Sequence, residues 1–432
     1  MAKEQTKLVR FLSEYSVPLI VGVIAAMAMA NLSPHVYEHI VHSPIYSLLS
    51  EPETAGHHGH AHDAGAHGSH WDHYLTVHFL VNDIFMVFFF GIAAKEITEA
   101  CLPGGALNPP SKAVNPLCGT LGGVLGPVAV FLGLNALVGK SEWTNGWGIP
   151  TATDIALAWL VAKLIFGKGH PAISFLLLLA VADDAIGLGI IAFAYPDPAH
   201  PTEWLNALWI VPGMIAAYTL RRRHVASWIP YVAIGGTLCW FGLHSAHLHP
   251  ALALVFIVPF MPGPNIDLGL YVDYQSEDGH AVSTIEKFEH ALRHYVDYGL
   301  FFFAFANAGV SMGGVSGLTW IVLASLLFGK TIGITLLSYL ADRAGFHLPQ
   351  GMDFRHLIVT SVIAGLGLTV ALFVSGQAFT EAGVQGAAKM GALLSVLAGV
   401  FAYVLAVALG IAKVGVTIPM PVVRSQKASS SG

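Results

Sequence analysis

The sequence predicts an all-α membrane protein with about twelve transmembrane helices, and three observations carry this prediction. Of the 432 residues, 55% are apolar and only 11% are Asp, Glu, Lys or Arg, whereas about a quarter of a soluble domain is charged. The mean hydropathy is +0.65. Long apolar segments recur along the whole chain. This composition leaves too little polar surface for a soluble globule, so the soluble protein classes are excluded.

The apolar segments define the expected spans, since a helix needs about 20 residues to cross a bilayer. We expect one polytopic domain over residues 1–432, and the first segment is interpreted as a retained helix because no small-residue cleavage site follows a short apolar core. The segments near 205 and 248 are short. The twelve segments are 15–33, 76–100, 113–138, 147–163, 171–194, 205–220, 226–242, 248–262, 295–311, 316–341, 355–378 and 390–415.

The positions of Lys and Arg predict the orientation, because cytoplasmic loops are rich in both. If the N-terminus is cytoplasmic, 17 of the 20 cations fall on the inner face, all except Lys140, Lys389 and the buried Lys330. The C-terminal segment 416–432 is then a cytoplasmic tail. We therefore expect a multi-pass protein of the bacterial inner membrane with both termini in the cytoplasm.

Residues 35–75 form an external loop in this arrangement, and the loop contains ten His. Dense imidazoles bind divalent transition metals, but a closed metal site needs a fixed ligand set, and the Gly, Ala and Ser between these His residues fix none. Two interpretations stay open, a solvated loop or a metal-buffering or pH-responsive segment.

Ionisable side chains inside the apolar segments are the candidates for function. Each is expensive at bilayer depth, so a transport or proton-relay role is the default interpretation. Adjacent aspartates on a helix point about 100° apart, and two neighbouring carboxylates in a low dielectric do not both ionise easily. Such a pair holds either a proton or a small hard cation, which is the minimum requirement for exchange. The candidates are Asp83, Asp154, Asp183, Asp184 and Lys330.

Lys330 is the one cationic residue in this set, and its charge is opposite to that of the four aspartates. A buried ammonium needs an anionic partner, so a cation that binds this partner would displace Lys330 and release its proton. A static salt bridge between two helices is the alternative interpretation. For Asp183 and Asp184 the corresponding alternative is a polar helix contact without transport.

Two segments carry residues that interrupt helices. Gly148 and Pro150 precede Asp154 in the fourth segment, and Gly365 and Gly367 lie inside the eleventh. Proline removes a backbone donor and disfavours helix in the preceding residue, and unwound backbone at membrane depth must line protein or water. Interrupted helices at matching places predict inverted repeats around an ion site, here spans 3–5 and 10–12, with Asp154 neutralising the positive half-helix ends.

The stretches IPTATDIALA, ADDAIGLGIIA, FFFAFANAGVS, LLFGKTIGI and IAGLGLTVALFVSG occur in this order and resemble the bacterial NhaA-type sodium/proton antiporter family over most of residues 75–410. Inverted repeats are characteristic of that family, so the repeat argument is not independent of the resemblance. The resemblance implies a twelve-span inner-membrane antiporter that exchanges Na⁺ or Li⁺ for a larger number of protons, for sodium and pH homeostasis. It also implies a homodimer, and no chemical cofactor beyond the transported ions.

The resemblance also assigns roles to individual residues of this sequence. Asp184 and Asp183 match the ion and proton carboxylates, which would hold the transported Na⁺. Thr153 and Asp154 match the interrupted fourth helix. Lys330 matches the lysine that pairs with the first aspartate, Gly365 matches the break in the eleventh span, and Asp83 matches a further family acid.

The chain departs from the family pattern at the cytoplasmic end of the second span. Ala93 replaces the family glutamate, while Glu96 lies one turn further on. Glu289 and His290 match the cytoplasmic pH-response region, and His249 at the edge of a later span is a further pH-response candidate. We therefore expect a pH profile that differs from that of typical members.

Two other classes deserve comparison. A zinc or nickel carrier, as a divalent-metal/proton exchanger, would explain the His-rich loop, but its core should hold His or Cys rather than Asp and Lys. An intramembrane aspartyl protease would explain paired acids, but those acids should lie on separate helices in Y-D and G-x-G-D contexts, which the DDA stretch does not provide. We expect a transporter rather than an enzyme, with the lipid bilayer as its surroundings and no nucleic acid partner.

Overall fold

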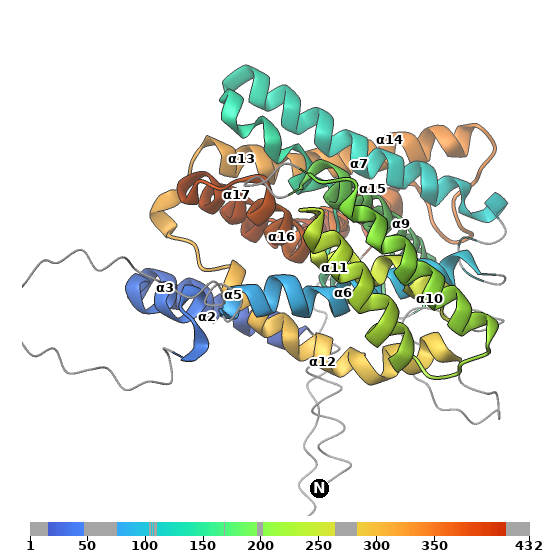
Figure 1. The fold of residues 1–432 in the computed structure, drawn as a ribbon. Helices are drawn as coiled ribbons and strands as arrows, with labels where there is room; N and C mark the ends of the chain where they lie inside the picture. Colours follow the sequence, from blue (N-terminus) through green and yellow to red (C-terminus); the bar gives the residue numbers. More distant parts are fainter. Residues whose placement is uncertain are drawn as a thin grey trace, which may run out of the picture.

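The computed structural model describes residues 16–46, 76–102, 105, 107, 110–167, 169–196, 202–263 and 283–411. In these residues the fold is helical throughout, with no strand beyond one isolated bridge between Pro44 and Thr76 (Figure 1). Most of the predicted His-rich loop and the whole predicted tail lie outside the described residues. The all-α class is therefore confirmed.

The helices of the first half follow the predicted apolar segments, except that Pro34–His42 is helical although it falls almost wholly in the predicted external loop 35–75. Several predicted spans consist of two consecutive pieces, one of them a 3-10 or π helix. In chain order the pieces are α2 (Val17–Leu32), α3 (Pro34–His42), α5 (Val77–Phe79), η2 (Leu80–Phe85), α6 (Met86–Cys101), α7 (Pro110–Val138), η3 (Ser141–Thr151), α8 (Ile155–Phe166), α9 (Pro171–Ala194), η4 (Asn206–Trp209) and α10 (Ile210–Arg222).

The second half continues the pattern. The eighth predicted segment is two short 3-10 helices rather than an α-helix. The pieces are η5 (Tyr231–Gly236), α11 (Thr237–Ser245), η6 (Pro250–Phe256), η7 (Val258–Phe260), α12 (Thr284–Asn307), η8 (Met312–Gly314), α13 (Gly317–Ala324), η9 (Ser325–Gly329), α14 (Lys330–Arg343), α15 (Phe354–Ile363), α16 (Leu368–Ala378), α17 (Ala382–Leu394) and α18 (Leu397–Ala408).

The number of clear spans is smaller than the predicted twelve. Among the described residues, five helices are long and apolar enough to cross a membrane, or up to seven if each of two bent pairs is one span. The other segments fall short because their helices are brief, as in α10, or carry many charges in one half, as in α12. A count of twelve stays a prediction.

The two bends fall in the segments whose Gly and Pro residues predict an interruption. The axes of η3 and α8 differ by 55° across the gap Ala152–Asp154, and those of α15 and α16 differ by 48° across Ala364–Gly367. Gly367 has no room for a side chain, since a Cβ there would lie 2.6 Å from Leu326 Cδ2 and 3.1 Å from Ala152 O. The two breaks therefore meet at the centre of the molecule.

Helices α7 and α14 run side by side along one edge of the bundle (Figure 1). Their contact is made by glycines: a Cβ on Gly122 would lie 2.0 Å from Gly333 O, and one on Gly126 would lie 2.3 Å from Gly329 O. Small residues allow this close backbone approach, a packing mode typical of membrane helices. The contact fixes the height of Lys330, which follows Gly329 directly.

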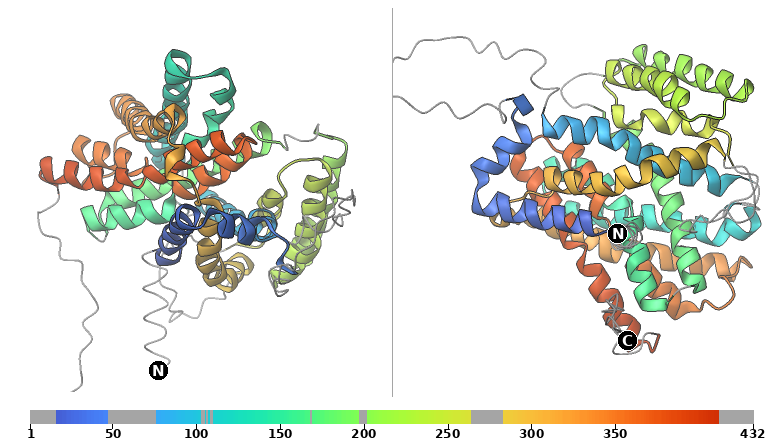
Figure 2. Two further views of the ribbon diagram at one scale, coloured as in Figure 1. Left: turned by 90° about the vertical axis from the view of Figure 1, so that its left-hand side faces the viewer. Right: turned by 90° about the horizontal axis from the view of Figure 1, so that it is seen from below.

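The remaining helices lie around the two broken spans. α2 packs along α12, while α10 and α11 form a hairpin at the periphery of the bundle (Figure 2). α9 occupies an inner position, in contact with α6, α7, α8 and α15, and it carries the aspartate pair.

Candidate functional site

The side chains of Asp183 and Asp184 leave α9 in different directions, as adjacent positions on a helix require. Asp183 is completely buried and faces Lys330 of α14. Asp184 is only partly buried and lines a pocket between α6 and α9. The two carboxylates therefore have different surroundings, one enclosed by polar groups and the other open to a cavity.

Asp183 belongs to a buried polar cluster. Lys330 Nζ forms an ion pair with Asp183 Oδ2 and donates to Thr153 Oγ1 at 2.7 Å. The Thr153 hydroxyl lies 2.8 Å from Asp183 Oδ2 and 2.9 Å from Ala364 O, and its single proton is donated to one of these acceptors at a time. Lys330 and Asp183 are 0% exposed and Thr153 is 1% exposed. Removing one partner of such a buried pair would leave an uncompensated charge.

The helix before Lys330 is adapted to this contact. Residues Ser325–Gly329 form a single π-helical turn, a feature often found at functional sites. Gly329 lies against the backbone of α7, where a Cβ would be 2.6 Å from Pro127 Cα. The π turn and this close packing together deliver the Lys330 side chain to Asp183.

Asp154 joins the two broken spans. Its Oδ1 accepts from Leu157 N–H at 3.1 Å and caps α8, while its Oδ2 accepts from Thr369 N–H at 3.2 Å in the first turn of α16. Its own N–H donates to Leu366 O at 2.6 Å. One carboxylate thus faces the positive ends of two half-helices, which favours its negative charge.

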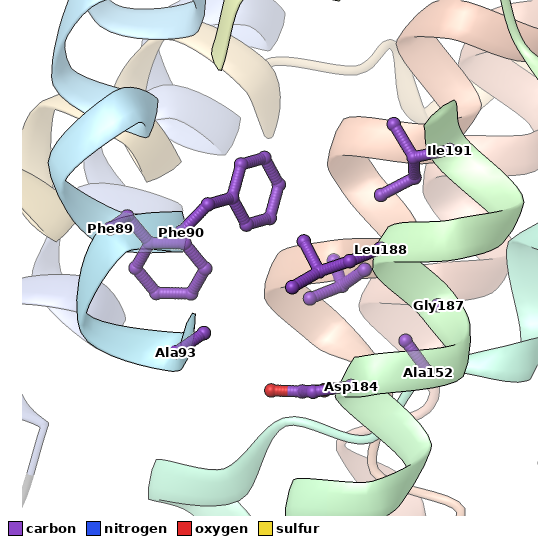
Figure 3. Close-up of a pocket in the computed structure, with 9 residues that line it drawn as sticks. Phe89, Phe90, Ala93, Ala152, Asp184, Gly187, Leu188 and Ile191 are labelled. Atoms are coloured by element: carbon purple, nitrogen blue, oxygen red, sulfur yellow. The ribbon is translucent and has the colours of Figure 1, made fainter. Parts of the chain in front are cut away.

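The Asp184 pocket is otherwise apolar. Figure 3 shows Phe89, Phe90 and Ala93 of α6 opposite Leu188 and Ile191 of α9, with the Asp184 carboxylate pointing toward Ala93. Gly187, Ala152 and Val370 complete the lining. Asp184 is therefore the ionisable group of this pocket, and Ala93 is the residue that its carboxylate faces.

Both aspartates keep acceptor capacity. Asp183 Oδ1 and Asp184 Oδ1 are buried oxygens with no hydrogen-bond partner among the described residues. Buried polar atoms normally have partners, and these two oxygens on adjacent residues are free to bind a proton or a cation. Hard cations prefer oxygen ligands of this kind.

Of the predicted pH-response residues, Glu96 and Glu289 lie close together where α6 meets α12. Glu289 of α12 pairs with Lys95 of α6 at 2.5 Å and with Arg293 at 3.1 Å, and Lys95 also pairs with Glu99 at 2.7 Å. His290 is exposed, whereas Glu96 is half-buried on α6. Glu99 and Arg293 were not among the predicted residues, although the four-residue spacing of Lys95–Glu99 and Glu289–Arg293 is typical of helical ion pairs.

Two further predicted residues lie apart from the aspartate cluster. His249 is 8% exposed at the start of η6, and its ring centroid lies 4.7 Å from that of Phe373 in α16. Asp83 lies on the π-helical turn η2, and its backbone carbonyl accepts from Trp240 Nε1 at 3.3 Å. Asp83 is separated from Ala93 by ten helical residues, or about 15 Å.

Tyr195 is a buried connector that sequence reasoning missed. Its hydroxyl donates to Asn145 O at 2.7 Å and accepts from Gly148 N–H at 2.8 Å. Asn145 Nδ2 in turn donates to Ala378 O at 2.8 Å, at the end of α16. A Cβ on Gly148 would lie 2.6 Å from the tyrosine oxygen. Gly148 therefore serves close packing against Tyr195 as well as the interruption of the fourth segment.

Comparison with known proteins adds evolutionary evidence to this geometry. The family model described as Na⁺/H⁺ antiporter 1 matches residues 7–406. A protein named Na(+)/H(+) antiporter NhaA from Desulfitobacterium hafniense (strain DSM 10664 / DCB-2) is 54% identical over 411 residues, which cover 95% of this chain and 98% of the relative.

More distant relatives carry the same name. One from Geobacter sulfurreducens is 52% identical over 408 residues, covering 94% of this chain and 99% of the relative. One from Jannaschia sp. (strain CCS1) is 41% identical over 409 residues, covering 89% and 94%. Members of this family are transporters rather than enzymes. The chain belongs to the Na⁺/H⁺ antiporter 1 family, the family of the NhaA antiporters.

Proposed function

We propose that this protein is an electrogenic Na⁺(Li⁺)/H⁺ antiporter in which cation and protons compete for Asp183 and Asp184. The observation that carries the proposal is the pair of buried carboxylate oxygens that have no hydrogen-bond partner within the described part of the chain, one beside Lys330 and the other in the pocket. Thr153 contributes a third oxygen beside Asp183.

The arrangement accounts for competition in chemical terms. A cation at Asp183 would compete with the Lys330 ammonium for the same oxygen, so its arrival favours neutral lysine and release of a proton. Asp184 releases a second proton when it becomes a cation ligand. Two protons would then cross the membrane in one direction for each monovalent cation that crosses in the other. Each cycle therefore moves net charge, which makes the exchange electrogenic.

The crossed breaks supply a frame for alternating access. Spans 3–5 and 10–12 would be inverted repeats, with Asp154 at the point where their half-helices meet. We place both termini in the cytoplasm and the protein in the bacterial inner membrane, as twelve spans and the Lys and Arg distribution require, and we expect a homodimer. The helix ends that meet around the Asp154 carboxylate form a site that would move as a unit when the repeats rock.

The pH response would arise on α6 and α12. Ala93 faces the Asp184 carboxylate across the pocket, so the carboxylate that the family pattern has at this position is absent from the approach to Asp184. Glu96 and the Lys95–Glu289 pair lie further along, with His290 and His249 as the other candidates. Ala93→Glu is expected to shift the pH profile of exchange; an unchanged profile would contradict this part of the proposal.

An everted-vesicle assay tests the central claim. Asp184→Asn is expected to abolish the Na⁺-induced collapse of the proton gradient, because the amide neither ionises nor exchanges a proton. The matched control is Glu142→Gln, an exposed acid paired with Lys140 at 3.3 Å, which should retain wild-type exchange. Collapse of the gradient by Asp184→Asn at the wild-type rate would refute the mechanism.

Lys330→Ala separates the two interpretations of the lysine. If Lys330 takes part in coupling, the variant should move a different amount of charge per cycle in proteoliposomes held at a fixed membrane potential. If the lysine is a static salt bridge, only thermal stability should fall, while charge movement per cycle stays at the wild-type value.

The divalent-metal carrier receives no support. In the described part of the chain, no group of three His, Cys, Asp or Glu side chains is arranged to hold a metal ion, and the relatives are named for Na⁺ and H⁺. Uptake of ⁶⁵Zn and ²²Na into the same vesicles compares the two functions directly; zinc uptake driven by a proton gradient would reopen the alternative.

A further inference from the structure

Two histidines stack where α9 and α15 begin. His170 precedes α9 and His356 lies in the first turn of α15, and their ring centroids are 4.8 Å apart with an interplanar angle of 22°. Phe166 stacks on His170 at 5.2 Å. The contact joins the helix of the aspartate pair to the first half of a broken span, although the two residues are 186 positions apart.

His170 is the N-cap of α9. Its Nδ1 accepts from Ala172 N–H at 3.1 Å, so the ring must be neutral with its proton on Nε2. His356 Nδ1 lies 2.7 Å from Asp353 Oδ1, and Asp353 caps α15 by accepting from Arg355 N–H at 2.9 Å and His356 N–H at 3.1 Å. The N-terminus of each helix is therefore capped by one side chain, His170 for α9 and Asp353 for α15. The two caps are linked through the stacked rings of His170 and His356.

Protonation of His170 is incompatible with this arrangement. A proton on Nδ1 converts the acceptor into a donor that faces the Ala172 N–H. The resulting imidazolium lies at the positive end of α9 and beside a second imidazole. Burial, and then the neighbouring His356, lower the pKa of His170, while Asp353 acts in the opposite direction. His356 and Asp353, both from α15, are the charged groups that act on it.

We propose that His170, His356 and Asp353 form a proton-sensitive clasp that positions α9 against α15, and that protonation of His170 opens the clasp and slows exchange. The inference rests on the proposed function and deepens its pH regulation. Asp183 lies 13 residues along α9, or about 20 Å from His170. The break after α15 contributes the Ala364 carbonyl, which lies within hydrogen-bond distance of the Thr153 hydroxyl. Movement of α9 relative to α15 would therefore disturb the Thr153–Asp183 contact.

The sign of the effect follows from linkage. His170 is harder to protonate in the clasp than in a free chain, so the clasp is fully formed above the ordinary imidazole value of about 6.5. It weakens progressively as the pH falls below that value. Acid conditions thus reduce exchange through the clasp, in addition to direct proton competition at the aspartates.

His170→Asn tests the clasp in the full-length protein. Asparagine is a good N-cap but does not titrate, so α9 stays capped at every pH. In proteoliposomes, the acid limb of the exchange profile should move to lower pH by about half a unit, which makes the rate about threefold higher than that of the wild type well below the wild-type midpoint. The apparent KM for Na⁺ above pH 8 should not change. His170→Ser, a second capping substitution, should behave alike.

His347→Asn is the matched control. His347 is an exposed histidine that follows α14, and its Nδ1 lies 3.2 Å from Asp342 Oδ1. Its profile should superimpose on that of the wild type. Thermal unfolding of the purified protein gives a second readout: the wild type should lose more stability between pH 8 and pH 5.5 than His170→Asn does.

Two results would overturn the clasp. One is superposition of the His170→Asn and wild-type acid limbs together with equal losses of thermal stability. The other is an equal shift in the His347→Asn control. Absence of Na⁺/H⁺ exchange in the wild type at every pH would instead refute the proposed function, and the thermal-stability comparison would still decide whether the clasp exists.

Discussion

Replacement of Asp154 by Ala probes the junction of the two broken spans. The carboxylate accepts from Leu157 N–H of α8 and from Thr369 N–H of α16, and its side chain is 3% exposed. Alanine removes both acceptors at once and leaves two buried donors without partners. Ordinary N-cap substitutions affect one helix, so this one is expected to be unusually severe.

The expected magnitude follows from these two contacts. Loss of an N-cap typically costs about 1 kcal/mol, and a buried donor left unpaired costs about 1–3 kcal/mol. Two donors therefore give a loss of about 2–6 kcal/mol in the free energy of unfolding. Asp154→Asn should lie between the wild type and Asp154→Ala, because the amide keeps one oxygen acceptor and turns an NH₂ group toward the other donor.

Thermal unfolding of the purified protein measures the effect, with Ser316→Ala as the control. Ser316 caps only α13, where its Oγ accepts from Leu318 N–H at 3.3 Å. The decrease in Tm for Asp154→Ala should be at least about twice that for Ser316→Ala, in proportion to the number of caps lost. Equal decreases, or an Asp154→Asn variant as unstable as Asp154→Ala, would refute the double-cap reasoning.

Three further substitutions test other contacts. Thr153→Val removes the hydroxyl beside Asp183 and should raise the apparent KM for Na⁺ by about tenfold, as expected for loss of about 1.5 kcal/mol; ²²Na uptake with an unchanged KM would exclude this oxygen as a ligand. Gly122→Ala places a Cβ 2.0 Å from Gly333 O and should lower Tm, whereas Gly133→Ala in the same helix meets nothing within 4 Å and should leave Tm unchanged or raise it. Equal Tm values would show that α7 and α14 are not locked together. Tyr195→Phe removes a hydroxyl with two partners and should cost about 1–3 kcal/mol of stability; a wild-type unfolding curve would contradict the connector role.

Local sequence features predict much of the candidate site because they act through helix geometry. The divergence of Asp183 and Asp184 follows from their adjacency on α9. The bends fall where Pro150, Gly365 and nearby glycines weaken the helix. In each case the cause lies within a few residues of its effect, so one sequence is sufficient to locate it.

Contacts between distant segments escape such reasoning. Asp154 caps α16 across 215 positions of the chain, Tyr195 is hydrogen-bonded to Asn145 inside η3 across 50 residues, and His170 stacks on His356. Nothing in the local sequence around these residues indicates which distant residue each one contacts. The long-range pairings depend on how complete helices pack, and a single unaligned sequence does not encode that in any local pattern.

The sequence by itself determined the class of molecule, the short set of buried ionisable residues and the two interrupted helices. These features follow from the free energy of placing charge and unpaired backbone in a bilayer. The tertiary structure alone decided which carboxylate is enclosed and which is open. Asp183 and Asp184 are chemically identical, but the close packing of α7 against α14 brings Lys330 to Asp183, and the contact between the two broken spans brings Thr153 there. Asp184 is left facing the pocket beside Ala93. Their difference is a property of their neighbours.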